Sequence, residues 1–227
     1  MKKKLKVIVT GVTGMVGEGV LHECLQSPLV SEVLIISRKE AGFSHPKVKA
    51  ILHANMSDIS ALAEQVQGYD ACFFCLGVSS VGMKEEVYTK LTYDLTIGFA
   101  QTLVKLAPQL CFCYVSGAYT DSTEKGRSMW ARVKGRTENE LMRLFPNAYL
   151  FRPGYMRPTP GLKKTLKYYK YIDWLYPVLR KVFPSFIGSL SELGQAMLFC
   201  ATTGYPKKHL EVADIQVAAS KIKDENY

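Results

Sequence analysis

A glycine-rich turn near the N-terminus carries the clearest chemical signal of this sequence. Thr10-Gly11-Val12-Thr13-Gly14-Met15-Val16-Gly17 follows a β-branched apolar run and opens a helical pattern. Glycines at this spacing permit a tight turn, a close approach of the backbone to a pyrophosphate, and close packing of the helix, whose N-terminus supplies amide donors. The alternative is a turn that only connects two elements. The context favours a dinucleotide site formed by Gly11, Thr13, Gly14, Met15, Val16 and Gly17.

The end of the second apolar run bears on which dinucleotide binds. A site that prefers NAD usually presents an acid to the ribose hydroxyls at this point, but the chain has Ser37 and Arg38. A guanidinium can pair with a 2′-phosphate through two parallel hydrogen bonds. We therefore predict NADP as the cofactor, with NAD as the second choice and an exposed loop arginine as the alternative reading.

Apolar runs and helical patterns alternate through the first two thirds of the chain. This order predicts right-handed crossovers and a doubly wound parallel sheet, the Rossmann fold. The expected strands are Leu5–Thr10, Val33–Ser37, Val48–Leu52, Asp70–Leu76, Leu110–Ser116 and Ala148–Arg152. The expected helices are Gly14–Gln26, Asp58–Val66, Lys84–Ala107 and Arg127–Phe145. Asp58 is expected to cap its helix, although Asn55 and Asp58 also lie near where such folds contact adenine.

The last third, 155–227, reads as a substrate-side extension of the same single domain. Four prolines between Pro158 and Pro184 leave no strand pattern between them. We expect a basic aromatic helix over 162–176 that Pro177 ends or kinks, a helix over 191–202, and a short strand over 210–213.

Several motifs in residues 5–154 resemble the atypical short-chain dehydrogenase/reductases. The matching segments are TGVTGMVG, the Cys75-Leu76-Gly77-Val78 turn, Tyr114-Val115-Ser116-Gly117, Val133-Lys134-Gly135 and Phe151-Arg152-Pro153-Gly154. Within that class the chain is similar to the Tat-interacting-protein-like oxidoreductases and to nucleoside-diphosphate-sugar epimerases. The resemblance implies cofactor contacts from Leu76 and Gly77 and hydride transfer involving a small carbonyl or alcohol.

The resemblance also assigns roles to a serine, a tyrosine and a lysine. Ser116 matches the serine that hydrogen-bonds the substrate, and Lys134 matches the lysine that holds the nicotinamide ribose. The tyrosine position is Trp130, and an indole cannot cycle a proton near neutral pH. Three explanations stay open: Tyr119 or Tyr155 substitutes, the protein binds NADP as a catalytically impaired regulatory or redox-sensing protein, or the helix is misaligned. We name Ser116, Lys134 and Tyr119 as the catalytic set.

Composition excludes several classes of protein. Of 227 residues, 48% are hydrophobic and 22% charged, as in globular proteins and unlike disordered or fibrous ones. The apolar stretch Val7-Ile8-Val9 after the basic start is too short for a signal peptide, so we expect a cytoplasmic protein. The six cysteines lie mainly in strand patterns, and we expect them to be reduced and buried, without a metal.

The net charge of +9 favours anionic partners. Seven basic residues against one acid lie between Arg157 and Pro184, and the segment 163–176 interleaves lysines with aromatic residues. A lid over the substrate cleft or a dimer contact is the expectation that fits its location. Peripheral membrane contact is the second possibility, and nucleic acid is not expected.

Overall fold

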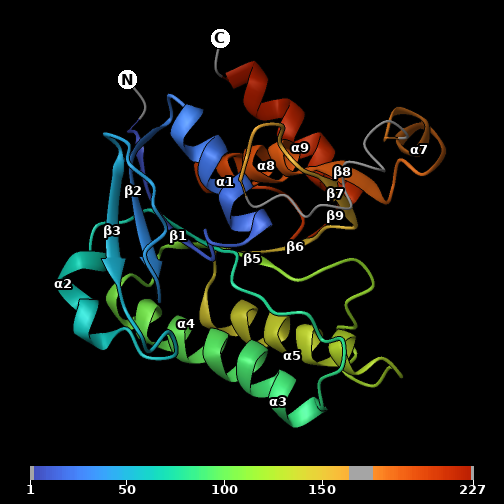
Figure 1. Ribbon diagram of the computed structural model, residues 1–227, viewed down its shortest axis with the longest axis horizontal. Helices are drawn as coiled ribbons and strands as arrows, with labels where there is room; N and C mark the ends of the chain where they lie inside the picture. Colours follow the sequence, from blue (N-terminus) through green and yellow to red (C-terminus); the bar gives the residue numbers. More distant parts are fainter. Residues whose placement is uncertain (1–2, 164–175, 226–227) are drawn as a thin grey trace.

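A parallel seven-stranded sheet forms the centre of the computed structural model, which describes residues 3–163 and 176–225 (Figure 1). The spatial strand order is β3-β2-β1-β4-β5-β6-β9, and every neighbouring pair is parallel. The strands are β1 (Leu5–Thr10), β2 (Val30–Ser37), β3 (Val48–Leu52), β4 (Ala71–Phe74), β5 (Cys111–Val115), β6 (Ala148–Arg152) and β9 (His209–Glu211). This sheet confirms the predicted doubly wound Rossmann fold.

Two helical layers cover the sheet and bury both of its faces. One layer contains α1 (Met15–Gln26), α8 (Leu190–Thr202) and α9 (Val212–Glu225). The other contains α2 (Ala63–Val66), α4 (Leu95–Leu106) and α5 (Met129–Leu144), with α3 (Glu85–Thr89) at its edge (Figure 1). Because both faces are covered, the inner strands are apolar at successive positions, and β4 is buried throughout.

The strand order reverses beside β1, and this reversal places the site. β1 pairs with β2 on one side and with β4 on the other, and the chain leaves β1 directly into the glycine turn. In open parallel sheets, the crevice at the carboxyl ends of the strands next to such a reversal is where ligands bind.

The predicted helix Lys84–Ala107 is interrupted. It consists of α3, a π-helical turn η2 (Lys90–Asp94), and α4. The helix predicted over Asp58–Val66 begins as a 3-10 turn η1 (Ser60–Leu62) before α2, and Asp58 Oδ1 accepts the Ser60 N–H at 2.9 Å. The residue that precedes η1 is Ile59, and no side chain caps the turn, so the expectation that Asp58 caps this helix is wrong, although its carboxylate accepts an amide of the first turn.

The C-terminal third contains more regular structure than the sequence predicts. β7 (Tyr155–Arg157) and β8 (Ile187–Ser189) form a separate two-stranded parallel sheet. The predicted strand 210–213 is wrong at its end, because β9 stops at Glu211 and Val212 already begins α9. Pro177 is the second residue of α7 (Tyr176–Val182).

The start of α8 has a complete capping box. The Ser189 hydroxyl accepts the Glu192 N–H, and the Glu192 carboxylate accepts the Ser189 N–H at 2.9 Å. Arg180 of α7 forms an ion pair with the same carboxylate, so α7 is fastened to the cap of α8.

The basic aromatic helix predicted over 162–176 lies outside the described residues except at its two ends. In the part of the chain that the structure does describe, no helix combines the length and the apolarity needed to cross a lipid bilayer.

Candidate active site

A cavity of about 420 Å³ opens where β1, β4 and β5 end. Eight of the predicted site residues line it: Gly14, Met15, Val16, Gly17, Leu76, Gly77, Ser116 and Lys134. Cys75, Val78, Ser79, Ser80, Tyr88, Val115 and Trp130 complete the described lining. Segments far apart in sequence therefore meet around one cavity, as the parallel sheet requires.

The glycine turn is packed so closely that side chains are excluded from it. A Cβ on Gly11 would lie 2.5 Å from the Cys75 carbonyl oxygen, and its φ is +72°. A Cβ on Gly17 would lie 2.2 Å from the Gly11 carbonyl oxygen. The three glycines therefore have distinct roles: Gly11 makes the turn, Gly17 lets α1 pack against it, and Gly14 precedes α1 without a side-chain cap.

This geometry fits a dinucleotide phosphate. Gly14 to Gly17, at the N-terminal end of α1, line the cavity, and a helix N-terminus favours an anion there. Gly11 and Thr13 do not line the cavity. Gly11 packs against the backbone of Cys75, which does line the cavity.

Ser37 and Arg38 lie beside this turn and outside the cavity. β1 and β2 pair up to Thr10 and Ile36, so the two residues follow directly after the last pairing. Ser37 is buried and donates its hydroxyl to the Lys39 carbonyl at 2.7 Å. Arg38 is exposed. Its guanidinium is therefore available at the edge where β2 ends.

Ser116 is held by a buried ionic network. Its hydroxyl donates to Glu138 Oε1 at 2.5 Å, and the Phe151 carbonyl lies 3.1 Å away. Glu138 is completely buried, and Arg152 donates to both of its oxygens, from Nε at 3.1 Å and from Nη2 at 2.5 Å. Sequence reasoning missed Glu138, although its position four residues after Lys134 places both on one face of α5.

Lys134 is buried, with 6% of its surface exposed. Its ammonium donates to the Val115 carbonyl at 3.1 Å and lies 4.8 Å from the centre of the Tyr114 ring. Burial lowers the pKa of Lys134 from 10.5 to about 8, and the Glu138 carboxylate offsets part of this shift. Lys134 therefore exchanges a proton closer to neutral pH than an ordinary lysine does.

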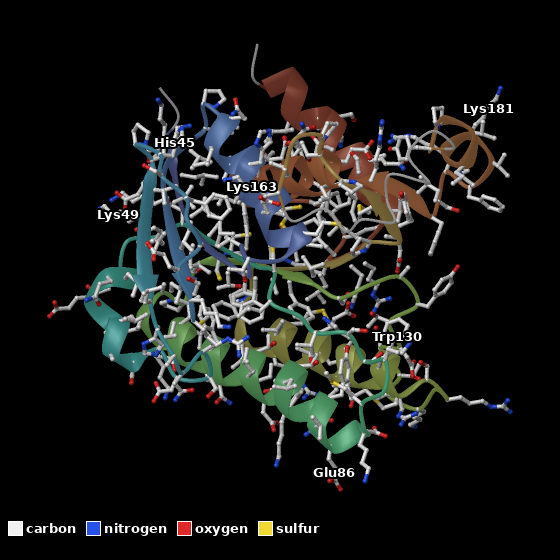
Figure 2. The ribbon with its side chains drawn as sticks, in the orientation of Figure 1. His45, Lys49, Glu86, Trp130, Lys163 and Lys181 are labelled. Carbon is white, nitrogen blue, oxygen red and sulfur yellow. The ribbon has the colours of Figure 1, made fainter. Side chains whose placement is uncertain are left out.

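The structure does not bring Tyr119 to the cavity. Tyr119 is 78% exposed, has a φ of +66°, and its ring lies 6.0 Å from that of Phe186. Tyr155 begins β7 and does not line the cavity either. Trp130, at the start of α5, does line it (Figure 2). The tyrosine in the described lining is Tyr88 of α3, which sequence reasoning missed, and burial raises its pKa.

Burial disfavours the thiolate form of Cys72, Cys75 and Cys113. All six cysteines are free, and Cys75, in the cavity wall, has a pKa raised to about 12 by burial. Burial raises the pKa of Cys72 and Cys113 as well. Within residues 3–163 and 176–225, no three His, Cys, Asp or Glu side chains gather where they could hold a metal ion.

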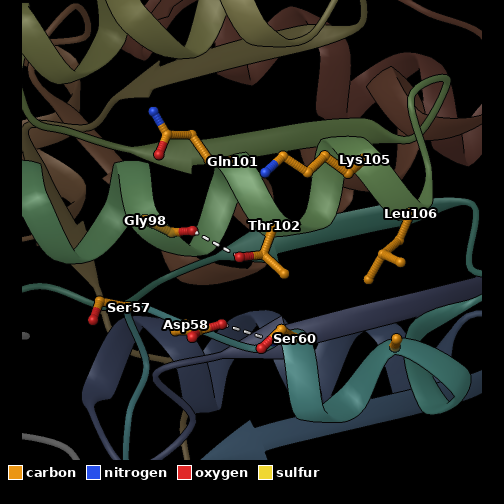
Figure 3. A pocket seen from close by; sticks show the side chains of 9 residues that line it. Ser57, Asp58, Ser60, Gly98, Gln101, Thr102, Lys105 and Leu106 are labelled. Atoms are coloured by element: carbon orange, nitrogen blue, oxygen red, sulfur yellow. Dashed lines mark hydrogen bonds between the residues drawn. The ribbon is translucent and has the colours of Figure 1, made fainter.

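A second hollow, about 470 Å³ in volume, lies between α2 and α4, away from the glycine turn (Figure 3). Asp58 lies in its wall, and its carboxylate is engaged by the Ser60 amide. Thr102 donates its hydroxyl back to the Gly98 carbonyl. Asn55 is not among the lining residues. We place the chemistry in the cavity beside the glycine turn, because only there do the turn, Ser116 and Lys134 meet.

A family model matches the part of the chain that contains the glycine turn. The model for the NAD dependent epimerase/dehydratase family matches residues 7–128, more than half of the chain. The chain belongs to the NAD dependent epimerase/dehydratase family. Membership confirms the resemblance to short-chain dehydrogenase/reductases and supports an NAD(P)-dependent protein of the oxidoreductase or epimerase type.

Solved structures share the fold at low sequence identity. Bordetella bronchiseptica WbmF, in complex with NAD+ and UDP, is 16% identical with a TM-score of 0.61, covering 99% of this chain and 79% of its own. Uronate dehydrogenase from Agrobacterium tumefaciens is 15% identical with a TM-score of 0.64, covering 93% and 76%. Glucuronic acid dehydrogenase from Chromohalobacter salexigens is 15% identical with a TM-score of 0.64, covering 91% and 75%. These likenesses show that this family member shares their fold.

Proposed function

We propose that this protein is an NADP-dependent oxidoreductase of the atypical short-chain dehydrogenase/reductase type that acts on a small carbonyl or alcohol. The observation that carries the proposal is the meeting of the glycine turn, Ser116 and Lys134 around one cavity. The turn suits a dinucleotide, and the two side chains suit a reacting oxygen and the nearby ribose. A cytoplasmic location, and a role of the segment 163–176 as a lid, a dimer contact or a peripheral membrane contact, stay predictions from the sequence.

Arg38 supports the choice of NADP over NAD. It is exposed directly after β2, beside the glycine turn, and no acid stands at that position. A 2′-phosphate at this edge would meet a positive charge and not a carboxylate. The NAD+ complexes of Bordetella bronchiseptica WbmF concern that protein, and its low sequence identity leaves the cofactor preference of this chain to its own residues.

Lys134 supports proton transfer in the absence of a tyrosine at position 130. The nicotinamide coenzyme supplies hydride transfer when it is bound. Among the described cavity residues, Lys134 has the pKa closest to neutrality, because the pKa values of Tyr88 and Cys75 are raised by burial. In alcohol oxidation, the uncharged amine would accept the hydroxyl proton, and its population falls as the pH drops below about 8.

A catalytically impaired, NADP-binding regulatory protein is the second candidate. Trp130 favours it, because it stands at the position of the usual proton-cycling phenol and lines the cavity. In this case the cavity would bind the dinucleotide and report its level or redox state without turnover.

Turnover measurements separate the two candidates. NADPH oxidation with a carbonyl panel, and NADP+ reduction with the matching alcohols, are followed for the wild type, Tyr119→Phe and Trp130→Tyr. We expect an active wild type whose kcat/KM for alcohol oxidation rises with pH and levels above about 8. Tyr119→Phe should match the wild type, because Tyr119 lies outside the cavity.

Each remaining outcome has a definite meaning. Loss of turnover in Tyr119→Phe would contradict our placement of that residue and favour the substitute hydroxyl. Turnover only in Trp130→Tyr would support the regulatory candidate, because the variant restores the missing phenol. If all three proteins bind NADPH and none turns it over, the oxidoreductase proposal fails and the regulatory one gains.

A further inference from the structure

The hydroxyl hydrogen of Ser116 points into the protein. A serine has one hydrogen to donate and two lone pairs with which to accept. Both acceptors within reach of Ser116 Oγ are internal: Glu138 Oε1 at 2.5 Å and the Phe151 carbonyl oxygen at 3.1 Å. Neither Glu138 nor Phe151 lines the cavity, whereas Ser116 does. Whichever acceptor takes the hydrogen, a lone pair of Ser116 Oγ remains for the cavity side.

Glu138 is fixed as a hydrogen-bond acceptor by its other neighbours. The Arg152 guanidinium donates to both carboxylate oxygens, which is the paired geometry that a charged carboxylate accepts. His209 Nε2 lies 3.5 Å from Glu138 Oε2. Burial lowers the pKa of the His209 imidazole. Lys134 lies four residues before Glu138 on α5, about one helical turn away. With Arg152 bound at both oxygens, the carboxylate has no hydrogen of its own to offer Ser116.

We propose that Ser116 accepts a hydrogen bond from a hydroxyl of the ligand and does not donate one to a carbonyl, and that Glu138 is the positioning residue that sets this polarity. The inference deepens the proposed function and rests on it for the identity of the site. It gives the ligand class: a molecule with a hydroxyl that donates to Ser116 Oγ, distinct from the hydroxyl whose proton Lys134 accepts. A carbonyl oxygen at the same place would face the lone pairs of Ser116.

The position of the hydrogen can be observed directly. Neutron diffraction from crystals of the wild-type protein after exchange into heavy water would locate the deuterium on Ser116. We expect it between Oγ and Glu138 Oε1, or shared with the Phe151 carbonyl. Nuclear density for this deuterium on the cavity side would overturn the proposal. This measurement needs neither coenzyme nor turnover, so it stands even if the proposed function fails.

Ligand preference tests the consequence. The probes are tert-butyl alcohol, which offers a hydroxyl hydrogen and cannot be oxidised, and N,N-dimethylacetamide, whose carbonyl only accepts and is not reduced. Their affinities for the NADPH-saturated wild type are measured by saturation-transfer NMR titration. We expect the alcohol to bind about tenfold more tightly, the value of one satisfied hydrogen bond. Equal affinity, preference for the amide, or no binding of the alcohol would contradict the proposal.

Variants assign the polarity to Glu138. In Glu138→Gln an amide can donate to Ser116, and in Ser116→Ala the acceptor is gone. We expect the preference to fall to about twofold or less in both. Glu140→Gln is the matched control, because Glu140 lies on the same helix and pairs only with the surface residue Arg143 among its described contacts, so it should keep the tenfold preference. If Glu138→Gln does not fold, Ser116→Ala and the neutron map decide.

The two proposals fail differently. A protein that binds no coenzyme and catalyses nothing refutes the proposed function, while the Ser116 hydrogen is still located by diffraction. A protein that binds NADPH and reduces carbonyls but has its Ser116 hydrogen in the cavity refutes only the polarity.

Discussion

When the protein folds, the ammonium group of Lys134 loses its contacts with water and gains contacts with one carbonyl oxygen and one aromatic ring. Its ammonium contacts the Val115 carbonyl and the Tyr114 ring, and no carboxylate touches it directly among its described hydrogen bonds and ion pairs. These two contacts replace only part of the stabilisation that water gives to the charged amine. The charged form is therefore disfavoured, and the pKa of Lys134 falls to about 8. The same burial that suits proton transfer therefore costs the fold stability.

This cost gives a prediction for stability against pH. The pKa of Lys134 is lower in the folded than in the unfolded protein, so between about pH 8 and 10.5 the unfolded state binds more protons. The free energy of unfolding should then rise with pH across this window, and below about pH 8 the full penalty remains. We expect Lys134→Met to be more stable than the wild type near neutral pH, by an amount of the order of 3 kcal/mol at most.

The measurement is urea denaturation of both proteins at pH values below and above this window. The stability difference between Lys134→Met and the wild type should shrink as the pH rises. Lys105→Met, on α4, is the control for removing a lysine. A difference that stays constant with pH would show that Lys134 titrates normally.

At the scale of elements, the glycine turn couples α1 to the strands. The methyl carbon of an alanine at position 17 would lie 2.2 Å from the Gly11 carbonyl oxygen. This oxygen belongs to the backbone of the turn, so it cannot move aside as a flexible side chain could. We expect Gly17→Ala to lose at least about 2 kcal/mol of stability and to bind NADPH at least about tenfold more weakly.

The control for Gly17→Ala is Gly42→Ala. Gly42 has a φ of +68° with open space around it, so its cost is the backbone strain alone, about 1 kcal/mol, with unchanged NADPH binding. Thermal unfolding and a coenzyme titration measure both quantities. Similar losses in the two variants would mean that the contact with Gly11 has no special weight.

The elements divide into those that local sequence determines and those that it does not. β1, β3 and β6 were predicted with the bounds that the structure has, because each is a short apolar or alternating run between turn residues. β7 and β8 could not be predicted, since each has only three residues and exists through pairing with the other. α9 had a readable signal, the buried spacing of Ile215, Ala218, Ala219 and Ile222, which the sequence reading overlooked.

The interruption of the helix after β4, and the close packing of α4, were not predicted from local sequence. The sequence Lys84–Ala107 is compatible with one helix, yet five residues form a π-helical turn. Gly98 of α4 meets the Ser57 carbonyl so closely that a Cβ would lie 2.4 Å from it. That contact comes from another loop, so helix propensity alone cannot show it.

At the scale of the whole molecule, the parallel sheet gathers the site. Residues of the turn, of the β4 and β5 ends and of α5 come together because all strands point the same way. Motif order was therefore enough to predict Ser116 and Lys134 in the cavity. It was not enough for Glu138 or Tyr88, whose roles depend on which face of a helix meets the sheet, or for Tyr119, which the loop after Ser116 turns outward.

The central claim is that the glycine turn and Arg38 together bind NADP. Thermal unfolding of the wild type and Arg38→Gln with NADPH, NADH or no ligand tests it most directly, with the surface variant Arg143→Gln as control. Saturating ligand at about 100 times its dissociation constant stabilises by roughly 2.7 kcal/mol, which raises the midpoint by several degrees at this size. We predict this shift with NADPH, a smaller one with NADH, and loss of the difference in Arg38→Gln only. Equal shifts in the wild type with both coenzymes, or none with either, would contradict the account.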